Sequence, residues 1–192
     1  ALLWLDRSKL EADARQRLHA TFTLGLARIL DEKPTRRRET EELYREALAE
    51  RRQMYDGSHE RVAMAELDHA RFLLEESDLE SARALLDHAL VVLDDPRDRA
   101  RAESVEALYL SQVGRLDEAE AKLEQSLATL MRGRQVPDIH ARRTADWLDE
   151  VRAAGQAASD HEKGATAAAV APSRPVGEEP DQGASSTETL RP

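Results

Sequence analysis

The stretch "ESARALLDHAL" (Glu80–Leu90) decides the fold, because its pattern occurs three times along the chain. "ETEELYREAL" begins at Glu39 and "DEAEAKLEQSL" begins at Asp117. In each segment a large apolar residue precedes a small residue by three positions and a leucine by four, which places all three on one stripe of a helix. The matching triplets are Tyr44, Ala47 and Leu48; Leu86, Ala89 and Leu90; and Leu123, Ser126 and Leu127.

The residues before these segments repeat as well. Ala70, Phe72 and Leu73 correspond to Ala107, Tyr109 and Leu110, Ala82 corresponds to Ala119, and Gly114 marks a turn. The unit is therefore a helix, a tight turn, a second helix and a connector. A single pair of this kind cannot bury both of its apolar faces, whereas stacked pairs can. The pattern predicts an all-α fold, an α-solenoid of antiparallel helix pairs.

Proline, glycine and aspartate positions divide the chain into these pairs. We expect helix pairs over about 8–54, 58–93 and 97–132, followed by a capping helix over 138–154. Four of the seven prolines and four of the eight glycines fall at or beyond Gly155. Such a segment buries too little apolar surface to offset the entropy of ordering it. The sequence thus predicts a helical domain over 1–155 and a disordered tail over 156–192.

Composition argues against several classes of function. The net charge is −10, which is unfavourable for binding nucleic acid. The chain contains no cysteine, which excludes disulfides and agrees with a reducing, cytoplasmic compartment. It contains no apolar run near the ~20 residues of a membrane helix, so we expect no membrane insertion. Because the chain begins with alanine, we also expect more protein upstream of Ala1.

Catalytic and metal-binding motifs are also missing from the sequence. The pair Glu66 and His69 has the spacing found in a carboxylate-bridged di-iron helix, but that site needs a second Glu-x-x-His motif, which the sequence lacks. There is no His-Glu-x-x-His and no phosphate-binding glycine loop. In "YDGSHERVA" (Tyr55–Ala63), His59 is most simply a connector residue that makes a local hydrogen bond. The prediction is a chain with no enzymatic activity, no metal and no cofactor.

The repeated segments resemble tetratricopeptide repeats in their turn, in the alanine after it, and in the order bulky, small, leucine. "YDGSHERVA" is similar to the connector of the kinesin-light-chain-like variety, through His59, Val62 and Ala63. "VPDIHARRT" (Val136–Thr144) looks like a second such connector. The sequence departs from the family's pattern where Glu66 and Glu103 occupy places that usually hold bulky apolar residues. The resemblance implies a right-handed superhelix.

What the resemblance implies about function is a scaffold for other proteins. The first helices of the pairs would line a concave groove that binds a peptide or helix of a protein partner. The candidate groove residues are Arg71, Glu75, Arg101, Ser104 and Gln112. A second hypothesis is that the chain is the regulatory C-terminal region of a larger bacterial serine/threonine kinase, because similar repeats commonly follow such kinase domains. A third is self-association through Trp4 and the apolar "ALLWL" at residues 1–5.

Overall fold

The structure is a computed structural model that describes the backbone of residues 12–170 and the side chains of residues 14–161. This part of the chain contains seven α-helices, one short 3₁₀ helix and no strand. The helices are α2 (Ala12–Asp31), η1 (Pro34–Arg36), α3 (Arg37–Met54), α4 (Glu60–Glu75), α5 (Leu79–Val92), α6 (Pro96–Gln112), α7 (Leu116–Met131) and α8 (Ile139–Val170). Described residues up to 157 belong to one compact unit, and those from 158 belong to another.

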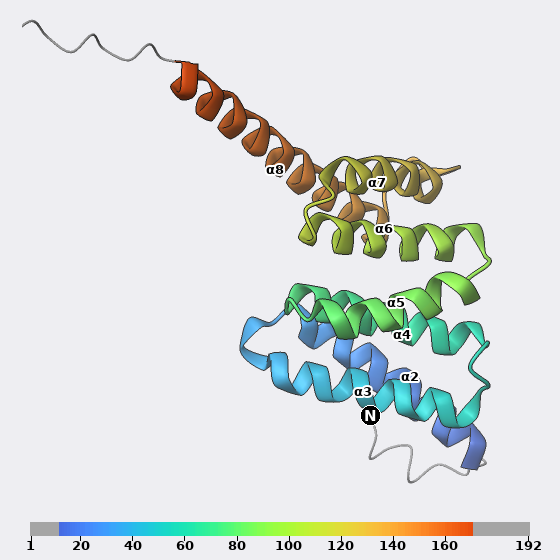
Figure 1. The fold of residues 1–192 in the computed structure, drawn as a ribbon. Coiled ribbons are helices and arrows are strands. Elements are labelled where there is room, and N and C mark those ends of the chain that lie inside the picture. Colours follow the sequence, from blue (N-terminus) through green and yellow to red (C-terminus); the bar gives the residue numbers. More distant parts are fainter. Residues whose placement is uncertain (1–11, 171–192) are drawn as a thin grey trace, which may run out of the picture. The chain divides into compact units, whose positions relative to one another are not determined.

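Within the first unit the helices pack as consecutive pairs (Figure 1). The closest packing joins α2 to α3, α4 to α5 and α6 to α7. Successive pairs meet through α3 and α4 and through α5 and α6, and the first helices of neighbouring pairs touch as well, α2 with α4 and α4 with α6. This arrangement is an α-solenoid and confirms the fold class predicted from the repeated triplets.

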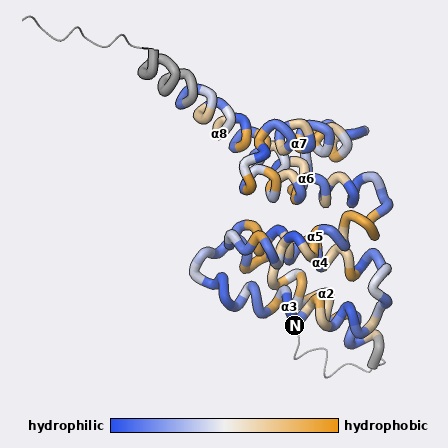
Figure 2. Tube along the Cα trace, in the orientation of Figure 1, coloured by the Kyte–Doolittle hydropathy of each residue, from blue (hydrophilic) through white to orange (hydrophobic). Residues whose placement is uncertain are grey.

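The repeat positions form the interior. Figure 2 shows hydrophilic and hydrophobic residues alternating along the helices, as expected of helices that bury one face. The large residue of each triplet is fully buried, as Tyr44, Leu86 and Leu123 show. The small residues Ala47, Ala89 and Ser126, together with Ala82 and Ala119, are also fully buried and allow neighbouring helices to approach closely. Leu48 is buried too, whereas Leu90 and Leu127 are partly buried against the same clusters.

Residues of the turns and of the connectors cap the helices that follow them. The carboxylate of Asp78 accepts a hydrogen bond from the backbone N–H of Ser81 at the start of α5, 3.2 Å away. The His59 ring does the same for α4, since its Nδ1 accepts from the backbone N–H of Arg61 at 3.0 Å. The ring also packs against Tyr55, with 4.2 Å between ring centroids. The local role predicted for His59 is confirmed.

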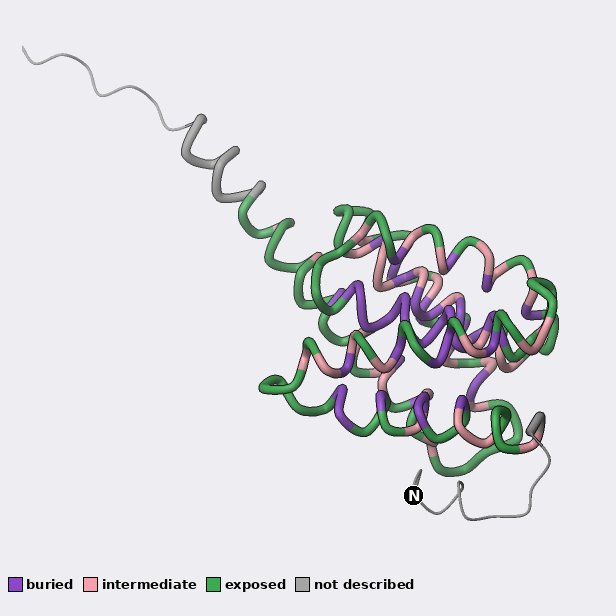
Figure 3. Tube along the Cα trace, turned by 90° about the horizontal axis from the view of Figure 1, so that it is seen from below, coloured by how far each residue is buried: buried purple, intermediate pink, exposed green. Residues whose placement is uncertain are grey.

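Helix α4 lies in the middle of the unit, in contact with α2, α3, α5 and α6. Buried positions gather in this central part, and the turns are exposed (Figure 3). Four ionisable residues of α4 are buried with the apolar ones: Glu66, Asp68, His69 and Arg71. Glu66, the departure noted in the sequence, contacts Arg52 of α3 at 2.7 Å and also His88 of α5. The buried charge is thus paired across three helices, which explains how this position tolerates a glutamate.

Helix α8 corrects one prediction. It runs to Val170, whereas the sequence predicted a capping helix ending at 154 and disorder from 156. The prediction is wrong for residues 156–170, because alanine-rich segments favour helix strongly even when they bury little. The rest of the predicted tail, 171–192, lies outside the described residues, as does the "ALLWL" segment. Among the described residues, no helix is long and apolar enough to cross a membrane.

Candidate binding groove

A small cavity of about 30 Å³ opens between α4, α6 and α8. The first two of these are the first helices of their pairs, and α8 follows the last pair, so the cavity lies on the side of the array that the first helices line. Its walls consist of Leu67, Asp68, Arg71, Arg101, Ser104, Val105, His140, Arg143, Thr144 and Trp147. Three arginines and one aspartate belong to this set, and acidic residues outside the set pair with two of the arginines.

Arg71 forms the buried wall of the cavity and is held in an ion-pair network. Its guanidinium donates to Asp31 of α2, to Glu75 at 2.5 Å and to the hydroxyl of Tyr44 at 3.2 Å. The Tyr44 hydroxyl also donates to Asp31 at 3.3 Å, and Arg37 donates to the other oxygen of Asp31 at 3.0 Å. Burial alone would lower the pKa of Arg71, but Glu75 and Asp31 outweigh it and the pKa is raised. Arg71 is therefore a fixed cation that ties α2 to α4.

Arg101 and Asp68 link α4 to α6, which are the first helices of the second and third pairs. Arg101 of α6 pairs with Asp98 at 3.0 Å and lies 3.9 Å from Asp68 of α4. Asp68 accepts a second contact from Arg28 of α2, whose Nε lies 3.0 Å away. These contacts connect α2, α4 and α6, so they fix the first helices of the three pairs relative to one another.

Ser104 and Gln112 complete these ties with neutral hydrogen bonds. The hydroxyl of Ser104 accepts from Thr144 of α8 at 3.0 Å and donates to the backbone carbonyl of Ala100 at 2.8 Å. The side-chain amide of Gln112 donates to the carbonyl of Leu74 at 3.0 Å.

The structure thus brings Arg71, Arg101 and Ser104 together in one cavity, as the helix phase suggested. Glu75 and Gln112 do not line it. Glu75 pairs with Arg71 and with Arg37, the latter at 3.5 Å. All five predicted groove residues carry contacts within the chain, and their contact with a partner remains a prediction.

Arg143 of α8 differs from the other two arginines. Within residues 14–161 it makes no hydrogen bond and no ion pair, although it is half-buried in the cavity wall. Burial and the nearby Arg71 lower its pKa, and the carboxylates of Glu75 and Asp31 oppose them in part. Next to it, burial lowers the pKa of His140 to about 4, and Arg101 acts in the same direction. The cavity therefore presents an unpaired cation beside a neutral imidazole.

These α8 residues were not among the predicted groove residues, because the sequence pattern predicted only a capping helix over 138–154. The signal was available. His140, Arg143, Thr144 and Trp147 recur at intervals of three and four, so they share one helix face. A further set, His19, Glu46 and Glu50, brings three potential ligand atoms within 4.8 Å of one another between α2 and α3. His19 and Glu50 lie 2.6 Å apart there, which accounts for this set as a contact between the two helices.

Comparison with known proteins agrees with the fold. The crystal structure of BtubC (BKLC) from P. vanneervenii, a kinesin-light-chain-like helical protein, matches with a TM-score of 0.60 and 19% sequence identity. The match covers 99% of this chain and 77% of that one. A scan against protein-family models finds no match, and neither does a search of curated proteins. In its architecture the chain is a helical-repeat protein, an α-solenoid.

Proposed function

We propose that the chain is a non-catalytic scaffold that binds an extended or helical segment of another protein in the groove lined by α4, α6 and α8. The observation that carries this proposal is Arg143, a half-buried guanidinium without an ion pair among the described residues. An unpaired buried cation is unfavourable, and an acidic group of a partner would relieve it. The neighbouring Trp147 and Leu67 offer apolar surface for a residue beside that acidic group.

The fold supports a proposal of this class. Stacked helix pairs expose the faces of several first helices side by side, and such faces suit an elongated ligand better than a compact substrate. The cavity is too small for a drug-sized molecule, but it accommodates a single carboxylate from a longer ligand that continues along the groove.

A peptide-display selection against the intact chain tests this proposal. We expect selected peptides to be enriched in aspartate or glutamate, and we expect Arg143→Glu to remove that enrichment. Arg142→Glu is the matched control, because Arg142 is the exposed neighbour on the same helix and does not line the cavity. A selection that yields no sequence preference, or that yields the same peptides with Arg143→Glu, would contradict the proposal.

The link to a bacterial kinase rests on the resemblance alone and remains a hypothesis. It is tested by the coding sequence upstream of Ala1, where a kinase domain would support it and further repeats would oppose it. Self-association through residues 1–5 also remains a prediction. Light scattering of the chain with and without residues 1–7 tests it, since the molar mass should fall on truncation.

A further inference from the structure

A second and larger cavity, of about 320 Å³, lies between α3, α4 and α5. It shares no residue with the groove described above. It is lined by the second helices of two neighbouring pairs, with α4 contributing two residues. The lining residues are Arg45, Leu48, Ala49, Arg52, His69, Leu73, Asp78, Ser81, Ala84 and Leu85. A volume of this size lies at the lower end of the range for small-molecule sites.

His69 is the unusual residue of this cavity. Its side chain is only 6% exposed, and neither ring nitrogen has a hydrogen-bond partner. The other buried ionisable residues of α4, namely Glu66, Asp68 and Arg71, all have partners. A buried imidazole with two unpaired nitrogens costs free energy, and such groups in native proteins call for an explanation. Among the described residues, no polar group forms a hydrogen bond with this ring and so explains its burial.

The charges around His69 favour an anion. Burial, with Arg45 and then Arg52 acting in the same direction and Asp78 opposing them, lowers the pKa of His69 to about 4. The ring is therefore neutral near pH 7 and offers one N–H donor and one acceptor. Asp78 caps α5 and keeps its negative charge, so two guanidinium groups and one carboxylate line the cavity.

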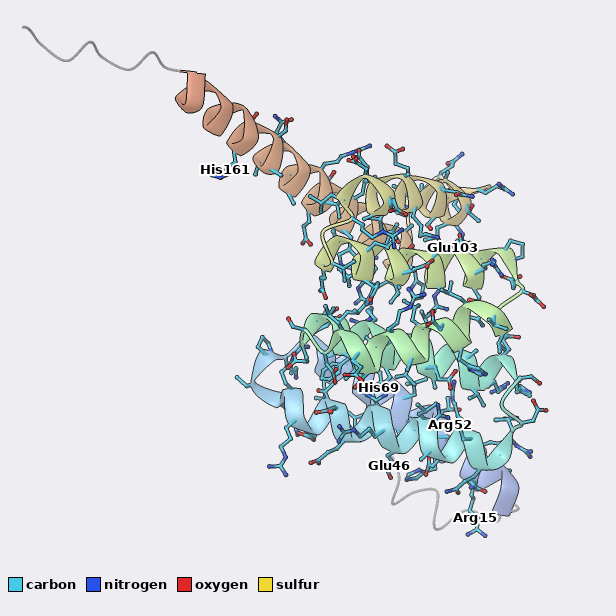
Figure 4. All side chains as sticks on the ribbon, viewed as in Figure 1. Arg15, Glu46, Arg52, His69, Glu103 and His161 are labelled. Atoms are coloured by element: carbon cyan, nitrogen blue, oxygen red, sulfur yellow. The ribbon has the colours of Figure 1, made fainter. Side chains whose placement is uncertain are left out.

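The two arginines are also largely exposed to solvent. Arg45 pairs with Glu41 at 2.5 Å and Arg52 pairs with Glu66 at 2.7 Å, but their side chains remain 66% and 53% exposed. Each guanidinium has five N–H donors, so each can keep its carboxylate and still bind a second acceptor. Figure 4 shows His69 between α3 and α5, and Arg52 further along α3. A group entering between the arginines reaches the ring once these exposed side chains are displaced.

We propose that this cavity binds a small organic anion, in which an anionic oxygen group lies between Arg45 and Arg52 and an apolar body packs against Leu48, Leu73 and Leu85. The anionic oxygen accepts the N–H of His69 and completes its hydrogen bonding. Carboxylates and phosphate monoesters share this chemistry. The cavity shares no lining residue with the peptide groove, so the two binding proposals can be tested and refuted separately.

The test is a titration of the full chain, followed through the ring signals of His69 in long-range ¹H–¹⁵N NMR spectra. The probes are benzoate, phenyl phosphate and the neutral benzamide, which has the shape of benzoate without its charge. We expect benzoate or phenyl phosphate to shift the His69 signals in a saturable way, and the stronger of the two identifies the anion class. Benzamide should shift them far less.

Variants make the result specific. Arg45→Gln with Arg52→Gln should weaken binding by about a hundred-fold, since two charge-assisted hydrogen bonds are removed. Arg83→Gln is the control, because it removes an exposed arginine of α5 outside the cavity. His69→Phe should also weaken binding. Arg45→Gln alone keeps the test valid if another variant fails to fold, because Arg45 pairs with the partly exposed Glu41 whereas Arg52 pairs with the buried Glu66. Equal shifts with benzamide, no saturable shift, or unchanged binding in the double arginine variant would overturn the proposal and leave a solvent-filled cavity.

Discussion

At the scale of single residues, this chain buries charged side chains between its helices and pairs them with one another. Asp31, 8% exposed, accepts from Arg37, Tyr44 and Arg71, which come from two other helices. Each member of this network is a hydrogen-bond or ion-pair partner of another member. Removing one residue therefore leaves buried polar groups of the others without partners.

Replacing Asp31 with alanine tests this network. We expect the free energy of unfolding to fall by about 3 kcal/mol, because Arg71 then loses its deepest partner. Asp87→Ala is the control, since Asp87 forms an exposed pair with Arg83 four residues away and should cost less than about 0.5 kcal/mol. Urea unfolding followed by circular dichroism measures both values. Equal small losses would show that Asp31 is not part of a buried network.

The same network changes how the groove should be probed. Reversing Arg71 to glutamate would place two buried carboxylates side by side and unfold α2 from α4. Loss of partner binding in that variant would therefore say nothing about the groove. Arg143, which has no ion pair among the described residues, is the better position for charge reversal.

His69 makes stability depend on pH. Its pKa is about 4 in the folded chain and near 6.5 when unfolded, so between these values the unfolded chain binds more protons. The free energy of unfolding should thus be highest above pH 6.5 and fall as the pH drops toward 4, by up to about 3 kcal/mol from this residue. His140 acts in the same direction.

His69→Phe keeps a ring against Tyr44 and removes the titrating group. Urea unfolding at pH 7 and at pH 4.5 should show a smaller difference in this variant than in the unmodified chain. An identical difference would mean that His69 does not titrate with the lowered pKa.

At the scale of elements, the two tight turns between paired helices illustrate what a sequence pattern can and cannot predict. Gly114 (φ 82°) joins α6 to α7, and Ser77 (φ 63°), 37 residues earlier, occupies the same left-handed conformation between α4 and α5. The glycine is an obvious turn signal, whereas the serine is not, because non-glycine residues rarely adopt this conformation.

Substitutions at these turns should have opposite effects. Ser77→Gly should raise the free energy of unfolding by about 0.5 kcal/mol by removing backbone strain, and Gly114→Ala should lower it by about 1 kcal/mol. Gly57→Ala is a suitable control, because Gly57 does not have a positive φ and an added Cβ would meet no atom within 4 Å. Thermal unfolding of the three variants gives the order of their stabilities, in which Ser77→Gly should be the most stable and Gly114→Ala the least. A destabilising Ser77→Gly would show that the serine side chain stabilises its turn.

The repeated triplets were enough to predict the helical hairpins, because burial at a fixed spacing is a local property of the sequence. Tyr44, Leu86 and Leu123 show this, as all three are fully buried. Two features could not be read in the same way. The ion pairs of Glu66 and Asp68 join different helices. The sequence has many acidic residues, and it does not show which of them are buried and paired in this way. The extension of α8 was hidden by a change in composition that also occurs in disordered segments.

At the scale of the molecule, the helical unit is stabilised in series, each pair by its neighbours. Leu123 belongs to a cluster with Ala107 and Leu110 of α6 and with Leu148 and Val151 of α8. Leu123→Asp should therefore destabilise both the last pair and α8, by about 4 kcal/mol or more, because an unpaired carboxylate replaces a fully buried leucine.

Hydrogen exchange locates that loss. Amides of α6, α7 and α8 should exchange faster in Leu123→Asp, while those of α2 and α3 should change least, since they pack elsewhere. Uniformly faster exchange over all helices would indicate a single cooperative core instead of a series of pairs.

The claim on which the functional account depends is that the groove at α4, α6 and α8 receives an acidic group at Arg143. The most direct measurement is the affinity of one display-selected peptide for the intact chain and for its Arg143→Glu and Arg142→Glu variants, by fluorescence anisotropy. We expect the affinity to fall by about ten- to a hundred-fold for Arg143→Glu and almost not at all for Arg142→Glu. Equal affinities for the two variants would contradict it.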